Sequence, residues 1–123
     1  MRIILDTHIF LWSLGDPERI REKSRAEIET LSNIVYVSTI SIAEIMIKSS
    51  IGKLRVDYDP VAKAQECGFE LLDFIAHEAL LLKELPFHHR DPFDRMLISQ
   101  SLANNFPIVT DDARFSDYGC KLL

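Results

Sequence analysis

Short runs of strand-forming residues alternate along this 123-residue chain with longer stretches of helical character. The strand-like runs are Arg2–Leu5, Ile34–Val37, Phe69–Leu72 and Pro107–Val109. Strands that alternate with helices form parallel sheets through right-handed crossovers, and the helices then cover both faces. We therefore predict an α/β fold: a single domain over residues 1–123, with a four- to five-stranded, mainly parallel sheet. The tail Tyr118–Leu122 is the candidate for a fifth, edge strand.

Proline, glycine and capping residues mark the predicted helix boundaries. Asp16, Asp59 and Asp91 each precede a proline, as an N-cap precedes proline at the first helical position. The predicted helices cover residues 17–31, 41–50, 58–67, 76–85 and 92–104. Residues 7–14 are apolar on several sides, and the pattern assigns them to no element.

The composition is that of an ordinary globular protein, with 47% apolar and 27% charged residues. No apolar run approaches the ~18 residues that would span a bilayer. Asp6 and His8 interrupt the apolar start of the chain, which otherwise resembles a signal peptide. Cys67 and Cys120 form no CxxC pair, and we interpret both as half-buried apolar residues. We expect a cytoplasmic protein with no membrane partner.

Acidic residues stand at or just beyond the ends of three predicted strands, and two more open the helix that leads into the last strand. They are Asp6, Glu44, Asp91, Asp94, Asp111 and Asp112. The carboxyl ends of parallel strands share one edge of the sheet, where ligands bind in such folds. These side chains are therefore expected to converge in space although they are scattered along the chain.

Converging carboxylates repel one another unless a cation lies between them. Hard oxygen ligands suit Mg²⁺ or Mn²⁺, and such ions promote attack of water on a phosphodiester. The net charge of −5 opposes a general electrostatic grip on nucleic acid, so local basic groups would have to hold it.

Most of these acids also have a structural interpretation as helix caps. The stretch Ser41–Glu44 fits an S-x-x-E capping box, and Asp91 fits an N-cap with Asp94 in the first helical turn. Asp111 or Asp112 fits a cap for the short segment after the last strand. Asp6 is hardest to explain in this way, because it ends an apolar strand and burying an unpaired carboxylate is unfavourable.

The histidines give weak evidence of a site. His88 and His89 are adjacent, so in an extended segment their rings point apart and no joint metal site is expected. The chain has no HExxH, GxxxxGK[ST] or GxGxxG motif, which removes the support for zinc-protease and nucleotide-loop functions.

Four segments together resemble the motifs of the PIN-domain family. They are Leu5–Thr7, Ser41–Ile45, His89–Ile98 and Val109–Asp112. The likeness is greatest to the VapC-like members, which are ribonuclease toxins of bacterial and archaeal type II toxin–antitoxin pairs. Each motif is short, but their order and spacing are specific and extend over residues 3–115.

The resemblance implies an endoribonuclease with an acidic Mg²⁺ or Mn²⁺ site. Carried across the matched motifs, the catalytic and metal-binding residues are Asp6, Glu44, Asp94 and Asp112. Thr7 and Thr110 match hydroxyl positions that orient these carboxylates, and Asp91 is kept as a helix cap or supporting residue.

The resemblance also implies three partners: RNA, a cognate antitoxin and a second copy of the chain. Candidate RNA-binding residues near the site are Arg90, Arg95 and Arg114. For Arg95 and Arg114 a solvated or purely structural role is the alternative. Residues 42–47 make their helix apolar on more than one side, which indicates deep burial or an interface.

Two other functions remain open from the sequence. A non-catalytic RNA-binding or scaffold module would keep the fold, although such a module tends to lose one or more of the four carboxylates. A phosphoacceptor domain of the receiver type would need adjacent acids after the first strand and a lysine after the last. Here Asp6 stands alone and no lysine follows until Lys121.

Overall fold

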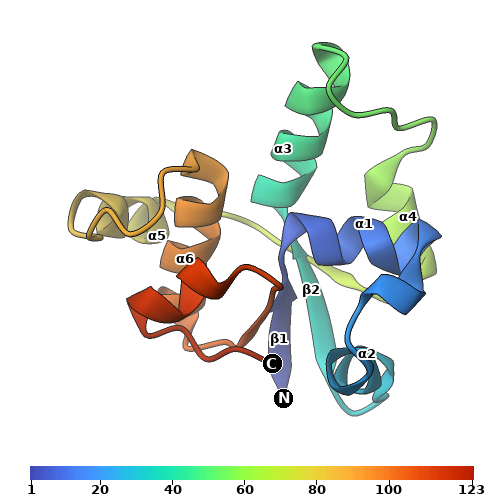
Figure 1. The fold of residues 1–123 in the computed structure, drawn as a ribbon, viewed down its shortest axis with the longest axis horizontal. Coiled ribbons are helices and arrows are strands. Elements are labelled where there is room, and N and C mark those ends of the chain that lie inside the picture. The colour runs from blue at the N-terminus through green and yellow to red at the C-terminus, as the bar shows by residue number, and fades with distance from the viewer.

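The computed structural model describes all residues from 1 to 123 as an α/β fold (Figure 1). Its strands are β1 (Arg2–Leu5), β2 (Ile34–Ser38), β3 (Glu70–Leu72) and β4 (Ile108–Val109). All strand pairs are parallel, in the order β3-β2-β1-β4, which confirms the predicted sheet. The predicted fifth strand is reduced to one parallel bridge between Ile108 and Leu122.

Helices cover both faces of the sheet, as predicted. The helical elements are α1 (Thr7–Gly15), η1 (Pro17–Arg19), α2 (Glu22–Glu29), α3 (Thr39–Ser50), α4 (Pro60–Glu66), α5 (Ala76–Leu80), η2 (Leu81–Lys83), α6 (Pro92–Asn104) and η3 (Ala113–Tyr118). Ile3 and Leu5 of β1 pack into one core cluster with residues of α1, α3 and α4, whereas Ile4 packs into a second with residues of α6 and η3. This alternation explains why the strands read as continuous apolar runs.

Several helical regions differ from the sequence prediction. Helix α1 follows β1 directly, over residues to which the sequence pattern assigns no element. The pattern does not reveal this helix, because its mostly apolar residues show no clear helical period. The predicted helix over residues 17–31 is divided into η1 and α2 by Arg21, whose backbone is extended at φ −56° and ψ 141°.

Helix α3 begins earlier than predicted, and this corrects the interpretation of Glu44. Ser38 is the N-cap, because its Oγ atom accepts a hydrogen bond of 3.1 Å from the backbone N–H of Ile40. The Ser41–Glu44 capping box is therefore wrong: both residues lie inside the helix and their side chains are buried. Glu44 is thus free for another role.

The strand register places the predicted site at one edge of the sheet. Leu5 of β1 pairs with Val37 of β2 and with Val109 of β4, so the residues that follow these three are neighbours. The backbone N–H of Asp6 donates a hydrogen bond of 3.0 Å to the carbonyl oxygen of Val109. In Figure 1 this edge lies at the top of β1, where α1 and α3 begin.

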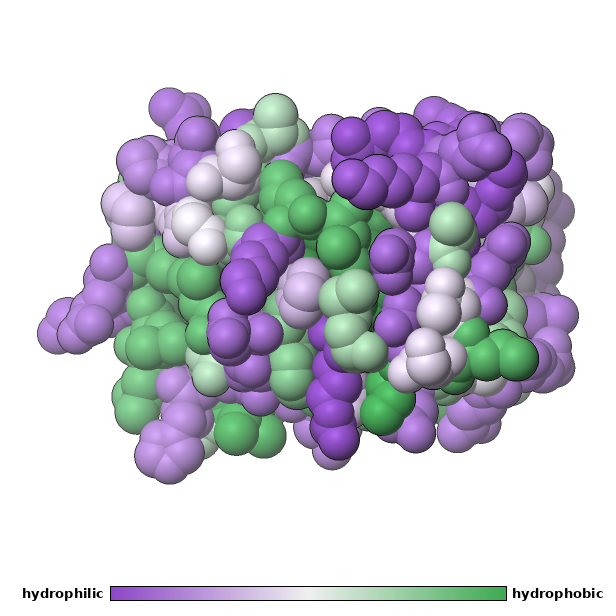
Figure 2. Space-filling view, turned by 90° about the horizontal axis from the view of Figure 1, so that it is seen from below, coloured by the Kyte–Doolittle hydropathy of each residue, from purple (hydrophilic) through white to green (hydrophobic).

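The opposite edge, at the amino ends of the strands, has no comparable acidic cluster. Figure 2 views the molecule from that side and shows hydrophobic and hydrophilic residues intermingled, with the hydrophilic ones densest at the upper right. None of the helices combines the length and apolar character that crossing a membrane requires.

Candidate active site

Asp6 lies at the end of the strand between β2 and β4, and its side chain is held from two directions. Its Oδ1 atom accepts a hydrogen bond of 2.8 Å from the backbone N–H of Ile9 and so caps α1. Its Oδ2 atom accepts one of 2.5 Å from the hydroxyl of Thr110, after β4. Burial raises the pKa of Asp6, because these hydrogen bonds only partly offset the loss of water and the Glu44 charge adds repulsion.

Glu44, on the second turn of α3, is also buried and anchored. The hydroxyl of Thr7 donates a hydrogen bond of 2.7 Å to Oε1, and the ammonium of Lys48 donates one of 2.5 Å to Oε2. Lys48 stands one helical turn after Glu44, and this contact raises the pKa of its ammonium group. The buried Ser41 hydroxyl lies 2.9 Å from Thr7 Oγ1, which ties α1 to α3.

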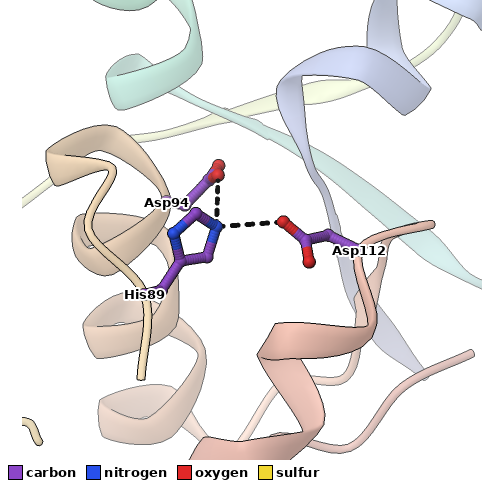
Figure 3. A group of neighbouring side chains, drawn as sticks. All are labelled: His89, Asp94 and Asp112. Carbon is purple, nitrogen blue, oxygen red and sulfur yellow. Dashed lines mark hydrogen bonds and ion pairs between the residues drawn. The ribbon is translucent and has the colours of Figure 1, made fainter. Parts of the chain in front are cut away.

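Asp94 and Asp112 meet around a buried histidine that the sequence analysis did not place in the site (Figure 3). The Nε2 atom of His89 lies 2.9 Å from Oδ2 of Asp94 and 2.9 Å from Oδ2 of Asp112. Asp94 belongs to the first turn of α6, and Asp112 follows β4 and caps η3. The ligand-type atoms of these three side chains all lie within 4.8 Å of one another, a spacing that suits a metal ion.

The four predicted carboxylates lie close enough to influence one another electrostatically. Burial has the largest effect on the pKa of Asp94, followed in order by the charges of Asp91, Glu44, Asp6 and Asp112, and together they raise it from 3.8 to about 7. Burial also raises the pKa of Asp112, but hydrogen bonds from Arg114 and His89 outweigh it and leave the pKa below its usual range. The structure therefore brings Asp6, Glu44, Asp94 and Asp112 together at one edge.

The other two acids of the predicted cluster have different positions. Asp91 is the N-cap of α6, since its Oδ1 atom accepts hydrogen bonds of 2.9 Å from Phe93 N–H and 3.0 Å from Asp94 N–H. Asp111 is exposed, and its carboxylate lies 3.7 Å from the guanidinium of Arg21. Asp91 thus positions Asp94 through α6.

The three predicted RNA-binding arginines occupy different environments. Arg114 is exposed and pairs with Asp112 through Nε at 3.1 Å and Nη2 at 3.0 Å, whereas Arg90 is exposed and lines a separate hollow together with Arg95. Arg95 is only 7% exposed, and its guanidinium donates hydrogen bonds to carbonyl oxygens in the connection between α5 and α6. Those acceptors are Leu82, Leu85 and Pro86.

These contacts favour the structural role for Arg95 over RNA binding. Its guanidinium also donates a hydrogen bond of 3.2 Å to the Tyr118 hydroxyl and lies 4.2 Å from the centroid of the Phe87 ring. A guanidinium with these partners fixes the connection between α5 and α6.

Two hollows meet at the acidic edge. One, of about 400 Å³, is lined by Asp6, His8, Trp12, Arg19, Asp111 and Asp112. The other, of about 360 Å³, lies between α1 and α3 and includes Thr7, Glu44, Lys48 and Lys53 among its lining residues. Both also involve His8 and Trp12, so the two hollows adjoin along α1 and lead past the carboxylates.

Several solved structures are similar to this chain in fold. The chain is similar to VapBC2 from Rickettsia felis, solved bound to a DNA fragment from their promoter, with a TM-score of 0.73 and 20% identity over 100% of this chain and 98% of that chain. It is similar to DNA-bound VapBC from Salmonella typhimurium, with a TM-score of 0.72 and 19% identity over 100% and 97%. It is similar to FitAcB from Neisseria gonorrhoeae, with a TM-score of 0.67 and 17% identity over 98% of this chain and 96% of that chain.

At these identities the structural likeness establishes the fold. Comparison with curated protein sequences gives no match. The sequence model of the PIN domain, however, matches residues 3–120, almost the whole chain and all four carboxylates. This protein belongs to the PIN-domain family.

Proposed function

We propose that this chain is a metal-dependent endoribonuclease and the toxin of a type II toxin–antitoxin pair. The observation that carries the proposal is the gathering of four carboxylates at the carboxyl edge of a PIN-domain sheet. These carboxylates belong to Asp6, Glu44, Asp94 and Asp112. Each comes from a different segment of the chain, so their meeting depends on the tertiary fold.

The donor set fits a hard divalent cation. Burial and mutual repulsion hold the pKa values of Asp6 and Asp94 above their usual range, which is the behaviour of carboxylates arranged to share a positive charge. Carboxylate oxygens are the ligands that Mg²⁺ and Mn²⁺ prefer. When bound, either ion supplies the charge that polarises a phosphate and lowers the pKa of a water molecule.

The remaining residues of the site hold the carboxylates in place. Thr110 and Thr7 donate hydrogen bonds to Asp6 and Glu44, which limits the rotation of both side chains. Asp91 fixes the first turn of α6 and with it the position of Asp94. A site of this kind needs little rearrangement when its ligand arrives.

Local positive charge compensates for the acidic balance of the whole chain. Lys48 contacts Glu44 and lines one hollow together with Lys53, and Arg114 stands over Asp112 at the other. We assign phosphate contacts to these cations and to the exposed Arg90. In this arrangement an RNA strand lies along α1 with its backbone next to the carboxylates.

The protein partners of this function are an antitoxin and a second copy of the chain. The similarity in fold to chains of VapBC structures supports an antitoxin partner. Ile45 of α3 is buried in the core, whereas Met46 and Ile47 are 42% and 49% exposed, so the helix is apolar on a solvent face as well. We assign that face to a homodimer. Sedimentation of wild type and Ile47→Glu tests the dimer, because the charged side chain should dissociate it.

We also place the protein in the cytoplasm, where RNA and antitoxin are available.

Growth arrest in cells tests the proposed activity. Expressed without a partner, the wild-type protein should arrest growth and Asp6→Ala should not, because losing a metal ligand lowers the rate by at least about a thousandfold. Glu70→Ala is the matched control, since this exposed carboxylate lies at the start of β3, away from the site, and its loss should leave the arrest intact. Equal arrest by a folded Asp6→Ala protein would leave the non-catalytic RNA-binding module as the better account.

A further inference from the structure

The imidazole ring of His89 is held on all sides. The ring is buried, with 3% of the residue exposed, and it packs edge-on against Phe115 with 5.9 Å between centroids and 80° between planes. The backbone N–H of His89 donates a hydrogen bond of 2.9 Å to the hydroxyl of Tyr118. Its Nδ1 atom accepts a hydrogen bond of 3.2 Å from the backbone N–H of Asp91.

That last contact fixes the tautomer of the ring. A backbone N–H can only donate, so Nδ1 must present a lone pair and the ring proton must sit on Nε2. The Nε2–H group then donates a hydrogen bond of 2.9 Å to Oδ2 of Asp112, and Oδ2 of Asp94 lies 2.9 Å from the same nitrogen as an electrostatic contact (Figure 3).

We propose that His89 is a positioning residue: its Nε2–H holds the Asp94 and Asp112 carboxylates side by side and leaves metal coordination to oxygen atoms. This inference rests on the proposed metal-dependent function. The spacing of the three side chains allows His89 to be either a metal ligand or a hydrogen-bond donor to the carboxylates. The tautomer favours the donor, because a nitrogen that carries the ring proton has no lone pair for a metal. A nitrogen ligand would instead favour softer transition metals.

The two carboxylates need such a link because they belong to independent segments. Asp94 moves with α6, whereas Asp112 moves with the loop between β4 and η3. Both face the same space, so repulsion drives them apart in the metal-free protein when both are ionised. The other contact to Asp112 comes from Arg114, which is exposed and does not reach across to α6 by any hydrogen bond. His89 is thus the side chain that joins them.

The tautomer can be measured without any metal. A long-range ¹H–¹⁵N correlation spectrum of the metal-free protein, with His89 assigned by its absence in His89→Gln, should show a ring that carries its proton on Nε2 and none on Nδ1. A proton on Nδ1 would overturn the proposal.

Two amide variants then separate positioning from a merely structural role. The side-chain nitrogen of Gln reaches roughly the place of Nε2, whereas that of Asn corresponds to Nδ1. We expect His89→Gln to bind Mn²⁺ within about threefold of wild type and His89→Asn to bind it about tenfold or more weakly. Unchanged affinity in both variants, or an equal loss in both, would contradict the proposed hydrogen bonds.

Electron paramagnetic resonance of bound Mn²⁺ tests the second half of the proposal. We expect the wild-type protein to show no directly coordinated nitrogen. A coordinated nitrogen signal that disappears in both variants would make His89 a metal ligand and overturn the positioning role. Circular dichroism checks that each variant folds. If His89→Asn does not fold, the resonance spectra of the wild-type protein alone show whether a nitrogen coordinates Mn²⁺. A wild-type protein that binds no Mn²⁺ would overturn the proposed function, and the tautomer would then decide the hydrogen-bonding role by itself.

Discussion

The hydroxyl of Thr110 donates a hydrogen bond of 2.5 Å to the Oδ2 atom of Asp6, a residue 104 positions earlier in the chain. This bond joins the ends of β1 and β4, and it lowers the pKa of Asp6 against the larger effect of burial. The site therefore depends on a contact between the first and last strands of the sheet.

Replacing Thr110 with Val should weaken the site without emptying the core. The variant keeps the shape of the side chain but leaves the Asp6 carboxylate short of one donor, so the pKa of Asp6 should rise further. We expect Mn²⁺ affinity to fall about tenfold. Isothermal titration measures it, and Thr110→Ser, which restores the hydroxyl, should recover most of the loss. Equal affinity in all three proteins would contradict the role given to this bond.

The stability of the metal-free protein should fall as pH rises toward neutrality. The pKa of Asp94 is about 7 in the folded state and near its ordinary 3.8 in the unfolded chain. Between those values the folded state binds more protons, so the free energy of unfolding decreases with increasing pH. The stabilisation that protonated Asp94 gives the folded state is fully present below pH 3.8 and is lost above about pH 7.

Asp94→Asn tests this dependence directly. Above pH 7 the variant should be more stable than wild type by about 1–2 kcal/mol, once the screening of a partly exposed carboxylate by solvent is taken into account. In acid the two proteins should unfold alike. Urea unfolding in chelator at both pH values gives the comparison, and a stabilisation that is independent of pH would disagree with the raised pKa.

Arg95 should matter for folding more than for RNA. Arg95→Ala removes the guanidinium donor from the carbonyl oxygens of Leu82 and Leu85 and one of two donors from that of Pro86, and we expect the free energy of unfolding to drop by about 2–4 kcal/mol. Arg95→Lys should recover little, because an ammonium group cannot match the planar fork of a guanidinium. Arg90→Ala, at an exposed neighbour, is the control and should change stability by less than about 0.5 kcal/mol. A stable Arg95→Ala protein with weakened RNA binding would reverse this assignment.

Asp91 separates the support of the site from its chemistry. Asp91→Ala should lower the free energy of unfolding by about 1 kcal/mol through the lost cap, and Asp91→Ser, which keeps a capping oxygen, should lower it less. Thermal unfolding in chelator measures both. If the two variants were equally unstable, repulsion or packing at Asp91 would explain its presence better than capping does.

The strands and the acidic edge were predictable because the signals are local. Runs such as Ile3-Ile4-Leu5 are apolar at every position, since both faces of a parallel sheet are covered. The Asp91-Pro92 pair likewise indicates an N-cap followed by proline at the first helical position, and α6 begins at Pro92 as predicted. The positions of Asp6 and Asp112 then follow from the rule that parallel strands present their carboxyl ends at one edge.

The errors concern contacts that no local pattern encodes. His89 reaches Asp112 across 23 residues, and nothing in the sequence distinguishes its inward ring from the exposed ring of His88. Helix α1 was not predicted, because its mostly apolar residues hide the helical period. The structural role of Arg95 was open from the sequence, because adjacent residues of a helix point about 100° apart and Arg95 therefore differs in direction from Asp94.

Cleavage of RNA by purified protein tests the central claim most directly. Wild type and Asp6→Asn are incubated with RNA in Mg²⁺, in Mn²⁺ and in chelator, after both proteins have been shown to fold. We expect wild type to cleave internal phosphodiester bonds with either ion and to stop in chelator, while Asp6→Asn loses at least about a thousandfold in rate. Cleavage that continues in chelator, or at the same rate in Asp6→Asn, would contradict a metal-dependent nuclease at this acidic edge.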